Sequence, residues 1–448
     1  MGPRRVRVVV VNHNGGDLTM SCLDSLRKSD WPLESLDLVL VDNASTDGVA
    51  GRARAELPEV RVVDAGANLG FAGGCNLALR DLEGVDYVAL VNNDAWVDPG
   101  WLAPLVEVLE RDPTVGAASP KILFADRFVD VHLASGTAVR GLGDRRPLGV
   151  RLSGARVDGQ DVWERLQLVA GFWGLEHGVD GEATFEWTNG EAHLRVPADH
   201  GENLPACELR LAADEERSVV LRSGGRCTEH RLTDQPRWYP VELGGDPFDV
   251  VNNVGSVVLA DGHGADRGYL ERDEGQFDEV EEVFAWCGAA VLLSPRYLEQ
   301  VGLFDDRFFL YYEDFDLSWR GRAQGWRYVY VPSSVVRHVH SASSVEGSPL
   351  FQHYDGRNRL LTLTRNAPAP LALREAARHL LITGSYARRD LVVPLARRRP
   401  LSVETVRRRM RAYGAYLTML PEALGDRRRL AGRARVTGEE LARWMVRR

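Results

Sequence analysis

The sequence predicts an α/β protein in which a parallel or mixed sheet carries helices on both faces, joined to an antiparallel β module and a helical C-terminal region. Near the N-terminus, short β-branched runs alternate with stretches of helical periodicity, which is typical of a parallel sheet covered by helices. The middle of the chain changes to short alternating strands, and its end changes to apolar stripes interrupted by arginine triplets. We therefore expect four segments, at residues 1–140, 141–249, 250–345 and 346–448.

The first segment contains four strand-like runs, each followed by a turn or a helix. Residues 6–13 and 36–42 are dominated by Val and Leu, which indicates strands buried in a parallel sheet. Between them, residues 17–28 carry Leu and Cys at helical spacing. A glycine-rich loop at 66–74 leads into another helix, and the strand within VDYVALVNND completes the alternation.

Polar side chains follow these strands. The positions concerned are Asn12, Asp42, Asn68 and Asp94. In open α/β sheets ligands bind outside the carboxyl ends of the strands, so these residues are expected to converge at one edge. Taken singly, each could be an ordinary turn or helix cap. Their occurrence at successive strand ends favours a binding site.

The most unusual stretch is FFLYYEDFDLSWR, which sets Glu313, Asp314 and Asp316 among bulky aromatic residues. Burial raises the pKa of a carboxyl group and a nearby cation lowers it, so such carboxylates can be tuned for proton transfer. His338 and His340 follow a strand-like run and could reach the same place. The alternative is a helix N-terminus, where acidic residues favour the helix dipole and the aromatic residues form core.

Composition is that of a soluble protein with a substantial core, since 44% of the residues are apolar and 27% are charged. The apolar runs are too short to span a bilayer, and the N-terminus does not have the pattern of a signal peptide. The five cysteines show no CxxC spacing, which favours reduced thiols over a zinc site. We therefore expect a cytoplasmic protein.

The net charge of −9 is unevenly distributed. From residue 371 to the end there are 19 arginines and 7 acidic residues, so the rest of the chain is acidic. A basic end indicates contact with a phospholipid surface, with nucleic acid, or only with solvent around a helical face. We favour peripheral contact with an anionic membrane at the inner face of the plasma membrane, because apolar stripes flanked by arginine suit an interfacial helix. We expect no nucleic-acid partner.

Several motifs, taken in order, resemble those of family 2 glycosyltransferases. They are VVVNHN, VDNASTDG, NLGFAGGCN, LVNNDAWVDPGWL, CGAAVLLSPRYLEQVGLFDDRFFLYYEDFDLSWR and VPSSVVRHVHSASS. The likeness covers about residues 6–135 and 250–345 and is nearest to the rhamnosyltransferase-like branch, which builds bacterial surface polysaccharides. It implies a GT-A fold, a nucleotide-diphosphate sugar donor, a divalent metal and inversion at the anomeric carbon.

The resemblance also assigns catalytic roles. Asp314 matches the general base that deprotonates the acceptor hydroxyl. Glu313 would orient Asp314 or contact the acceptor, and Asp316 would cap or brace the helix.

For the metal, Asp94 matches the last position of the DxD motif of GT-A enzymes, although Asn92 stands where many relatives have Asp. His338 matches a late metal-ligand histidine of the family, with His340 as the alternative. The ion would be Mg²⁺ or Mn²⁺, and an imidazole ligand suits Mn²⁺ better.

The donor side follows from the same resemblance. The implied donor-binding residues are Asn12, Asp42, Asn43, Asn68, Gly70, Asn76, Asn92 and Asn93. Asn12 and Asp42 match positions that hold the base and the ribose. Backbone N–H groups of the 66–74 loop could also bind phosphate, because that loop runs into a helix N-terminus.

Residues 141–249 lie outside the resemblance. Their alternating stretches and turns predict a small antiparallel β-sandwich inserted into a loop of the catalytic domain. Its aromatic residues could stack on sugar rings or form the core of the module. They are Trp163, Trp173, Trp187, Trp238 and Tyr239.

Together these features predict an inverting glycosyltransferase that moves a sugar from a nucleotide-diphosphate donor, with L-rhamnose from dTDP-rhamnose as the favoured case. The acceptor would be a hydroxyl of a cell-envelope glycan or of a lipid-linked acceptor. The alternative is a catalytically inactive sugar-binding or scaffold protein of polysaccharide assembly. A sugar-phosphate nucleotidyltransferase is disfavoured, because the first strand ends in NHNGG without a basic cluster.

Overall fold

The computed structural model describes residues 4–141, 144–177, 184–198, 204–339, 348–398 and 401–446. The chain divides into two compact units. The α/β unit comprises Met1–Leu123, Asn252–Tyr269 and Gly275–Arg448, and the β unit comprises Phe124–Val251 and Leu270–Glu274. In sequence, the β unit therefore interrupts the α/β unit.

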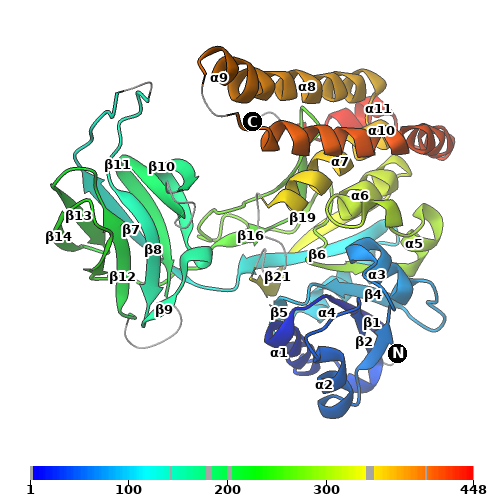
Figure 1. Ribbon diagram of the computed structural model, residues 1–448. Coiled ribbons are helices and arrows are strands. Elements are labelled where there is room, and N and C mark those ends of the chain that lie inside the picture. The colour runs from blue at the N-terminus through cyan, green and yellow to red at the C-terminus, as the bar shows by residue number, and fades with distance from the viewer. Residues whose placement is uncertain are drawn as a thin grey trace. The chain divides into compact units, whose positions relative to one another are not determined.

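The α/β unit is built on one mixed sheet (Figure 1), with strands in the order β19-β21-β6-β20-β4-β1-β2-β3, β5 beside β21 and β16 beside β6. The strands are β1 (Val6–Asn12), β2 (Leu36–Asp42), β3 (Arg61–Asp64), β4 (Tyr87–Val91), β5 (Ala95–Val97), β6 (Val115–Phe124), β16 (Val251–Asn253), β19 (Glu281–Glu282), β20 (Ala290–Leu293) and β21 (Arg327–His338). β1 is parallel to β2 and β4, whereas β20 is antiparallel to β4 and β6. The register sets Asn12 opposite Asp42, so the polar ends of β1 and β2 lie at one edge.

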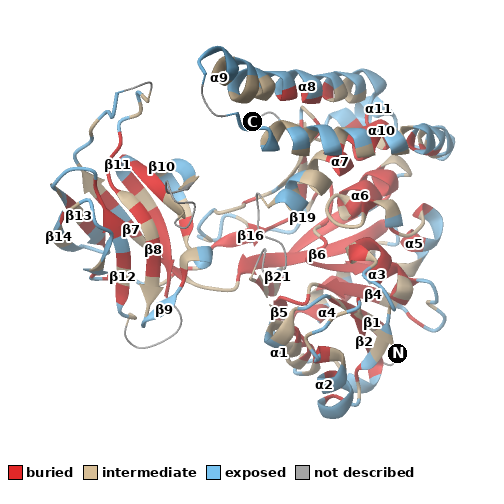
Figure 2. Cartoon of the chain, viewed as in Figure 1, coloured by how far each residue is buried: buried red, intermediate tan, exposed pale blue. Residues whose placement is uncertain are grey.

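Helices cover both faces of this sheet. They are α1 (Gly16–Arg27), α2 (Val49–Glu56), α3 (Gly70–Leu79), α4 (Leu102–Arg111), α5 (Pro295–Val301) and α6 (Glu313–Ala323). Along β1, Val8 and Val10 share a core with Cys22 and Leu23 of α1. Val11 points to the opposite face and lies against α3. The predicted α/β class is confirmed, and Figure 2 shows the sheet as the most deeply buried layer.

The C-terminal region is helical, as predicted. It comprises α7 (Pro349–Asn366), α8 (Ala369–Ala387), the π-helical turn η4 (Arg388–Val392), α9 (Val393–Ala396), α10 (Glu404–Ala431) and α11 (Gly438–Ala442). α10 packs along α7 and α8, and Leu360, Leu361 and Tyr416 share a core there. None of the helices in the described ranges is both long and apolar enough to cross a membrane.

A small sheet ties the chain end back to the α/β unit. β17 (Ser256–Leu259) and β18 (Gly264–Asp266) form an antiparallel hairpin, and β22 (Met445–Val446) adds to β17 in parallel. This β17–β18 hairpin also borders the candidate active site.

The β unit holds an antiparallel sheet in the order β14-β13-β7-β11-β8-β12-β15, with β10 on β11 and β9 on β8. Its strands are β7 (Phe128–Ser135), β8 (Arg151–Val157), β9 (Gln160–Asp161), β10 (Gln167–His177), β11 (Thr184–Pro197), β12 (Cys207–Ala212), β13 (Arg217–Ser223), β14 (Arg226–Leu232) and β15 (Arg237–Val241). Its inward side chains form a core of their own, which includes Val131, Leu194, Leu209 and Leu221.

Two features of the β unit differ from the sequence analysis. β7 pairs with β11 and β13, so the sheet begins before residue 141, which is the start that the sequence predicts for the module. Hydrogen bonds connect all the described strands of this unit into one sheet, so the two separate sheets of a sandwich are not seen. The reason is β11, a long strand that pairs with β7, β8 and β10 and has register shifts against β10.

Candidate active site

A buried polar cluster supports the ends of β1 and β4. The Asn12 carboxamide oxygen accepts hydrogen bonds from the Thr19 hydroxyl at 2.8 Å and from the Asn93 side-chain amide at 3.2 Å. The Asn12 amide nitrogen donates to Ser45 at 3.0 Å and to Asp47 at 3.3 Å. Asn12 and Asn93 are buried and connect the ends of β1 and β4. Their direct contact with a nucleotide-sugar donor stays a prediction.

A second polar group joins the end of β2 to the glycine-rich loop. Asn43 donates to the Asn68 side chain at 3.1 Å and to the Gly70 carbonyl at 3.0 Å, and it accepts from the Leu69 backbone. Asn68 is exposed and also contacts the His13 ring at 3.1 Å. The exposed Asn68 is therefore the member of this group that a ligand can reach.

Gly70 lets the glycine-rich loop touch the aromatic run. Its φ is +71°, and a Cβ there would lie 2.2 Å from the Phe309 carbonyl oxygen. The Phe71 N–H donates to that same carbonyl at 2.7 Å. A left-handed backbone and a close approach both require glycine, so Gly70 places the predicted donor loop against the segment that precedes α6.

Asp94 and His338 form the candidate metal pair. The Asp94 carboxylate lies 3.1 Å from His338 Nε2, and both side chains are buried. His338 Nδ1 lies 3.1 Å from the Asn252 carboxamide oxygen, which can only accept, so Nδ1 carries the proton. Nε2 then presents a lone pair beside a carboxylate, with the Asn92 amide 3.3 Å away. A proton or a cation shared by Asp94 and His338 would satisfy both acceptors.

Among the residues that the structure describes, few other side chains near this pair could ligate a metal. No group of three or more His, Cys, Asp or Glu side chains comes together among the residues that the structure describes. The two side chains fit a cation that takes its remaining oxygen ligands from water and from substrate phosphates. His340, the alternative ligand, lies outside the described residues.

Glu313 and Asp314 begin α6 and have different surroundings. Glu313 is buried, and its Oε2 has no hydrogen-bond partner among the described groups. Burial, and then the neighbouring Asp314, raise the pKa of Glu313 to about 8. Asp314 accepts from the Gly288 N–H at 2.8 Å and from the Phe315 N–H at 2.7 Å. Burial raises the pKa of Asp314 as well, while these two N–H groups oppose the change.

Asp314 lines a cavity of about 180 Å³. The other lining residues are Ser256, Gly264, Ala265, Asp266, Tyr311, Tyr312, Phe315 and Asp355. Cavity walls therefore come from the β17–β18 hairpin, the aromatic run, α6 and α7. Aromatic rings with a few carboxylates are suited to a sugar hydroxyl.

Two short links connect this cavity with the Asp94–His338 pair. Gly288 donates to Asp314, and the carbonyl of the next residue, Ala289, accepts from the Asn92 N–H at 2.9 Å. On β16, Asn252 contacts His338, while the adjacent Asn253 donates to Asp266 of the cavity at 2.5 Å. The fold thus brings the acidic pair and the candidate metal pair to neighbouring positions on one edge of the sheet.

The backbone before Glu313 is strained. Phe309, Tyr311 and Tyr312 have φ of +64°, +69° and +69°, a region that bulky side chains rarely occupy. Asn358 of α7, fully buried, donates to the carbonyls of Phe308, Leu310 and Tyr311 at 2.8–2.9 Å. The strain is held in place from outside the loop, as is common near functional sites.

Sequence reasoning did not single out Asn252, Gly288 or Asn358. Asn252 lies in the largely apolar string VVNNVG, where a search for amides in apolar elements could have found it, whereas Asn358 lies between two arginines in GRNR and carries no such signal. Gly288 acts through its backbone, for which a sequence carries no side-chain signal.

Three other residues that the sequence singles out form hydrogen bonds or ion pairs with other groups of the protein. Asn76 is buried and bonds to the Phe304 backbone and, at 2.6 Å, to Asp306. Asp42 accepts from the Ser45 N–H at 3.2 Å. Asp316 is fully buried and bridges Arg320, at 2.8 Å, to Arg365 of α7, which makes it a brace for α6.

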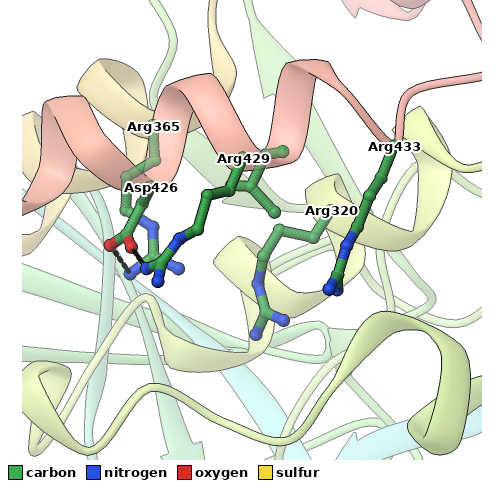
Figure 3. Close-up of a pocket in the computed structure, with 6 residues that line it drawn as sticks. Arg320, Arg365, Asp426, Arg429 and Arg433 are labelled. Carbon is green, nitrogen blue, oxygen red and sulfur yellow. Dashed lines mark hydrogen bonds and ion pairs between the residues drawn. The ribbon is translucent and has the colours of Figure 1, made fainter.

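A separate charged pocket lies between α6, α7 and α10. Its lining includes Arg320, Arg365, Asp426, Arg429 and Arg433, and its volume is about 230 Å³ (Figure 3). Arg365 and Arg429 both pair with Asp426, and Arg320 pairs with Asp316. These ion pairs tie α6, α7 and α10 together, so we assign the pocket a structural role.

Comparison with known proteins finds a family match over the N-terminal part of the chain. Residues 7–149 match the family model for glycosyl transferase family 2. This part of the chain is a family 2 glycosyltransferase domain. The match includes the ends of β1, β2 and β4, so Asn12, Asp42 and Asp94 all lie within the family 2 domain.

Curated relatives of the family 2 domain match only in part. An N-acetylglucosaminyl-diphospho-decaprenol L-rhamnosyltransferase of Mycobacterium tuberculosis is 39% identical over 82 residues, 18% of this chain and 27% of that protein. A poly(ribitol-phosphate) beta-glucosyltransferase of Bacillus spizizenii is 26% identical over 156 residues, 32% of this chain and 24% of that protein. The chain thus spans about a quarter of the length of these relatives.

Among solved structures, GalNAc-T7 with UDP, GalNAc and Mn²⁺ aligns with a TM-score of 0.46 and 14% identity. That alignment covers 94% of this chain and 57% of GalNAc-T7.

Proposed function

We propose that this protein is an inverting glycosyltransferase in which Asp314 is the general base. The observation that carries the proposal is the position of Asp314, which faces a cavity at the N-terminus of α6 and is linked through Gly288 and Ala289 to the Asp94–His338 side. A raised pKa makes its carboxylate a stronger base near neutral pH.

In the proposed reaction an acceptor hydroxyl enters the cavity and gives its proton to Asp314. The hydroxyl oxygen attacks the anomeric carbon from the face opposite the diphosphate and forms the new C–O bond. The bond between the anomeric carbon and the diphosphate oxygen breaks, and the nucleoside diphosphate leaves with its electron pair. Glu313, kept largely neutral by burial, adds no full second negative charge beside the base. Inversion follows from the single displacement.

A divalent cation fits the pair Asp94 and His338, and it would neutralise charge on the departing diphosphate. We expect EDTA to abolish transfer and Mn²⁺ or Mg²⁺ to restore it, measured as product formed. Unchanged turnover after chelation would remove the cation from the proposal.

For the donor we propose L-rhamnose from dTDP-rhamnose, and for the acceptor a hydroxyl of a cell-envelope glycan or a lipid-linked acceptor. The rhamnosyltransferase of M. tuberculosis supports this choice over the matched segment. Donor contacts are proposed for the edge residues Asn68, Asn92 and Asp42, which are not fully buried. A panel of nucleotide sugars, read by thermal shift, tests the donor, because a ligand stabilises the state it binds.

The decisive test is Asp314→Asn. We expect transfer to fall by about 10²–10⁴-fold, because the amide cannot accept the proton, while the donor still raises the melting temperature. Asp355→Asn is the matched control, since Asp355 lines the same cavity and burial raises its pKa too. Normal turnover by Asp314→Asn, or an equal loss with Asp355→Asn, would contradict the assignment of the base.

A second candidate is a sugar-binding or scaffold protein without catalysis. The observation in its favour is Trp173 of the β unit, which is 40% exposed and whose indole N–H is anchored to the Pro147 carbonyl at 2.9 Å. Trp187, in contrast, is buried in the β unit. Hydrolysis of a nucleotide sugar in the absence of acceptor discriminates the two, because only the enzyme releases nucleoside diphosphate.

For location we propose a cytoplasmic protein whose C-terminal helical region contacts an anionic membrane. The excess of arginine after residue 371 supports this contact.

A further inference from the structure

Helix α8 has an inverted distribution of side chains. Its most deeply buried residues are polar: Glu375, His379 and Thr383, at spacing i, i+4 and i+8. Its outer side exposes leucines, with Leu373 at 72% and Leu381 at 74% exposure. A helix at the surface of a globular domain normally buries the apolar side and exposes the polar one.

The buried polar side chains of α8 find hydrogen-bond and ion-pair partners on α7 and α10. Glu375 pairs with Arg359 of α7 at 3.3 Å. His379 contacts the Arg409 carbonyl of α10 at 3.2 Å, and Thr383 accepts from the Arg409 guanidinium at 3.0 Å. Because these contacts satisfy the buried polar groups, the orientation of α8 is built into the fold and the leucines belong on the outside.

The apolar outer side continues past α8 into η4 and α9. There Val392 is 59% exposed and Leu395 is 69% exposed. We call Leu373, Leu380, Leu381, Val392 and Leu395 the α8–α9 outer face.

Basic residues accompany the α8–α9 outer face. Residues 369–398 contain six arginines and two acidic residues, and one of the two, Glu375, is buried. Within the described part of the chain, Arg388, Arg397 and Arg398 form no side-chain ion pair. Exposed apolar side chains flanked by unpaired arginines match what an interfacial helix needs to bind an anionic bilayer.

We propose that the α8–α9 outer face docks on the surface of an anionic phospholipid bilayer, with its leucines and valine in the headgroup–acyl boundary and its arginines on lipid phosphates. A second copy of the chain suits this face poorly, since two such surfaces would bring like charges together. The bilayer supplies both the apolar layer and the negative charge.

The position of α8 gives this docking a role in acceptor binding. That role rests on the proposed function. Arg374 donates to the Ala260 carbonyl at 3.3 Å, and Arg378 pairs with Asp261 at 3.4 Å. Both partners lie in the turn of the β17–β18 hairpin, whose other strand, Gly264–Asp266, lines the Asp314 cavity. Docking through α8 therefore places the acceptor cavity beside the membrane, where an acceptor linked to a lipid would lie.

Sedimentation of the full chain with vesicles tests the docking without any sugar transfer. We expect binding to phosphatidylcholine vesicles that contain phosphatidylglycerol, weakened by salt, and little binding to phosphatidylcholine alone. The variant Leu373→Ser/Leu381→Ser should bind about tenfold more weakly or worse. Each of Arg388→Gln, Arg397→Gln and Arg398→Gln should lower the affinity about fivefold.

Matched controls test whether binding depends on the α8–α9 outer face or on any exposed apolar side chain. Val139→Ser/Val280→Ser removes two exposed apolar side chains, at 59% and 58% exposure, from other parts of the chain and should leave vesicle binding unchanged. The leucine variant should keep the parent melting temperature and turnover on a water-soluble acceptor, and lose turnover on a lipid-linked acceptor held in vesicles.

Three results would overturn the proposal. They are full vesicle binding by the leucine variant, equal binding to neutral and anionic vesicles, and a dimer of the parent chain that the leucine substitutions dissociate. If turnover fails on both kinds of acceptor while vesicle binding stands, the proposed function is wrong and the docking surface is not.

Discussion

At the scale of single residues, the acidic pair makes a testable statement about pH. Burial raises the pKa of Glu313 to about 8, whereas in the unfolded chain it ionises near 4.5. Between these values the folded protein binds more protons than the unfolded chain, so stability falls as pH rises from about 4.5 to about 8. Below this window Glu313 is neutral in both states and its full contribution to stability is present. Above it the buried carboxylate is charged and that contribution is lost.

We therefore expect Glu313→Gln to remove part of this pH dependence. The variant should gain on the parent as pH rises from about 4.5 to about 8, by a few kcal/mol in the free energy of unfolding, and the gain should level off above pH 8, because glutamine has no charge to bury. Urea unfolding of both proteins at several pH values measures the difference. Two curves that stay parallel across the window would show that Glu313 keeps an ordinary pKa.

The candidate site illustrates what single positions can and cannot reveal. Asp94 and His338 were grouped from a motif resemblance, and the structure sets their side chains 3.1 Å apart although 243 residues separate them. Asn252, which fixes the proton on His338, was not identified, because an asparagine after a short strand also fits an ordinary turn. Partners at this distance in sequence become visible only once the sheet is assembled.

At the scale of elements, the aromatic run before α6 depends on α7. Three residues of the run have positive φ, and one amide, Asn358, bonds to three of its carbonyls. No local pattern in the run predicts this conformation, since Phe and Tyr disfavour it. The helix start that carries Asp314 is thus positioned by a residue 44 places further along the chain.

We expect Asn358→Ala to lower turnover by about a hundredfold, because a shift of the base of about 1 Å is enough for such a loss. The buried carbonyls left without a donor should also cost about 1–3 kcal/mol of stability. Thr362→Val is the control, since Thr362 is buried one turn later on α7 and its hydroxyl has no partner among the described groups. A position-specific effect lowers kcat at saturating donor with donor affinity unchanged. Equal losses in kcat and donor affinity would indicate general unfolding instead.

The start of the β unit shows why element boundaries escape a reading of the sequence. The run KILFADRFVDVHLAS carries β6 into β7 with only a short turn between them, so composition does not change where one unit ends and the other begins. The pairing of β7 with β13, some 85 residues away, belongs to a sheet that no local alternation specifies. Strand periodicity thus predicted an antiparallel module but not its extent or its strand order.

At the scale of the whole molecule, the basic C-terminal region uses its arginines in two ways. Some are taken inward: Arg409 contacts α8, and Arg427 donates to the Thr364 and Ala367 carbonyls. Others, such as Arg388 and Arg397, remain on the surface. The count of charges in the sequence indicated an anionic partner, and only the fold distinguishes the arginines that can meet it.

Two separate hydrophobic cores lead to the last prediction. The β unit has its own core around Leu194 and Leu209, and the α/β unit has another around Val8 and Leu105. Because each core is closed within its unit, calorimetry should resolve two unfolding transitions. A nucleoside diphosphate at about 100 times its Kd should stabilise only the α/β transition, by about 2.7 kcal/mol. A free glycan that stabilised the other transition instead would give the β unit a binding role of its own. If a nucleotide shifted both transitions equally, the donor site could not be confined to the sheet edge of the α/β unit, and the assignment of Asp94, His338 and Asp314 to one site would fail.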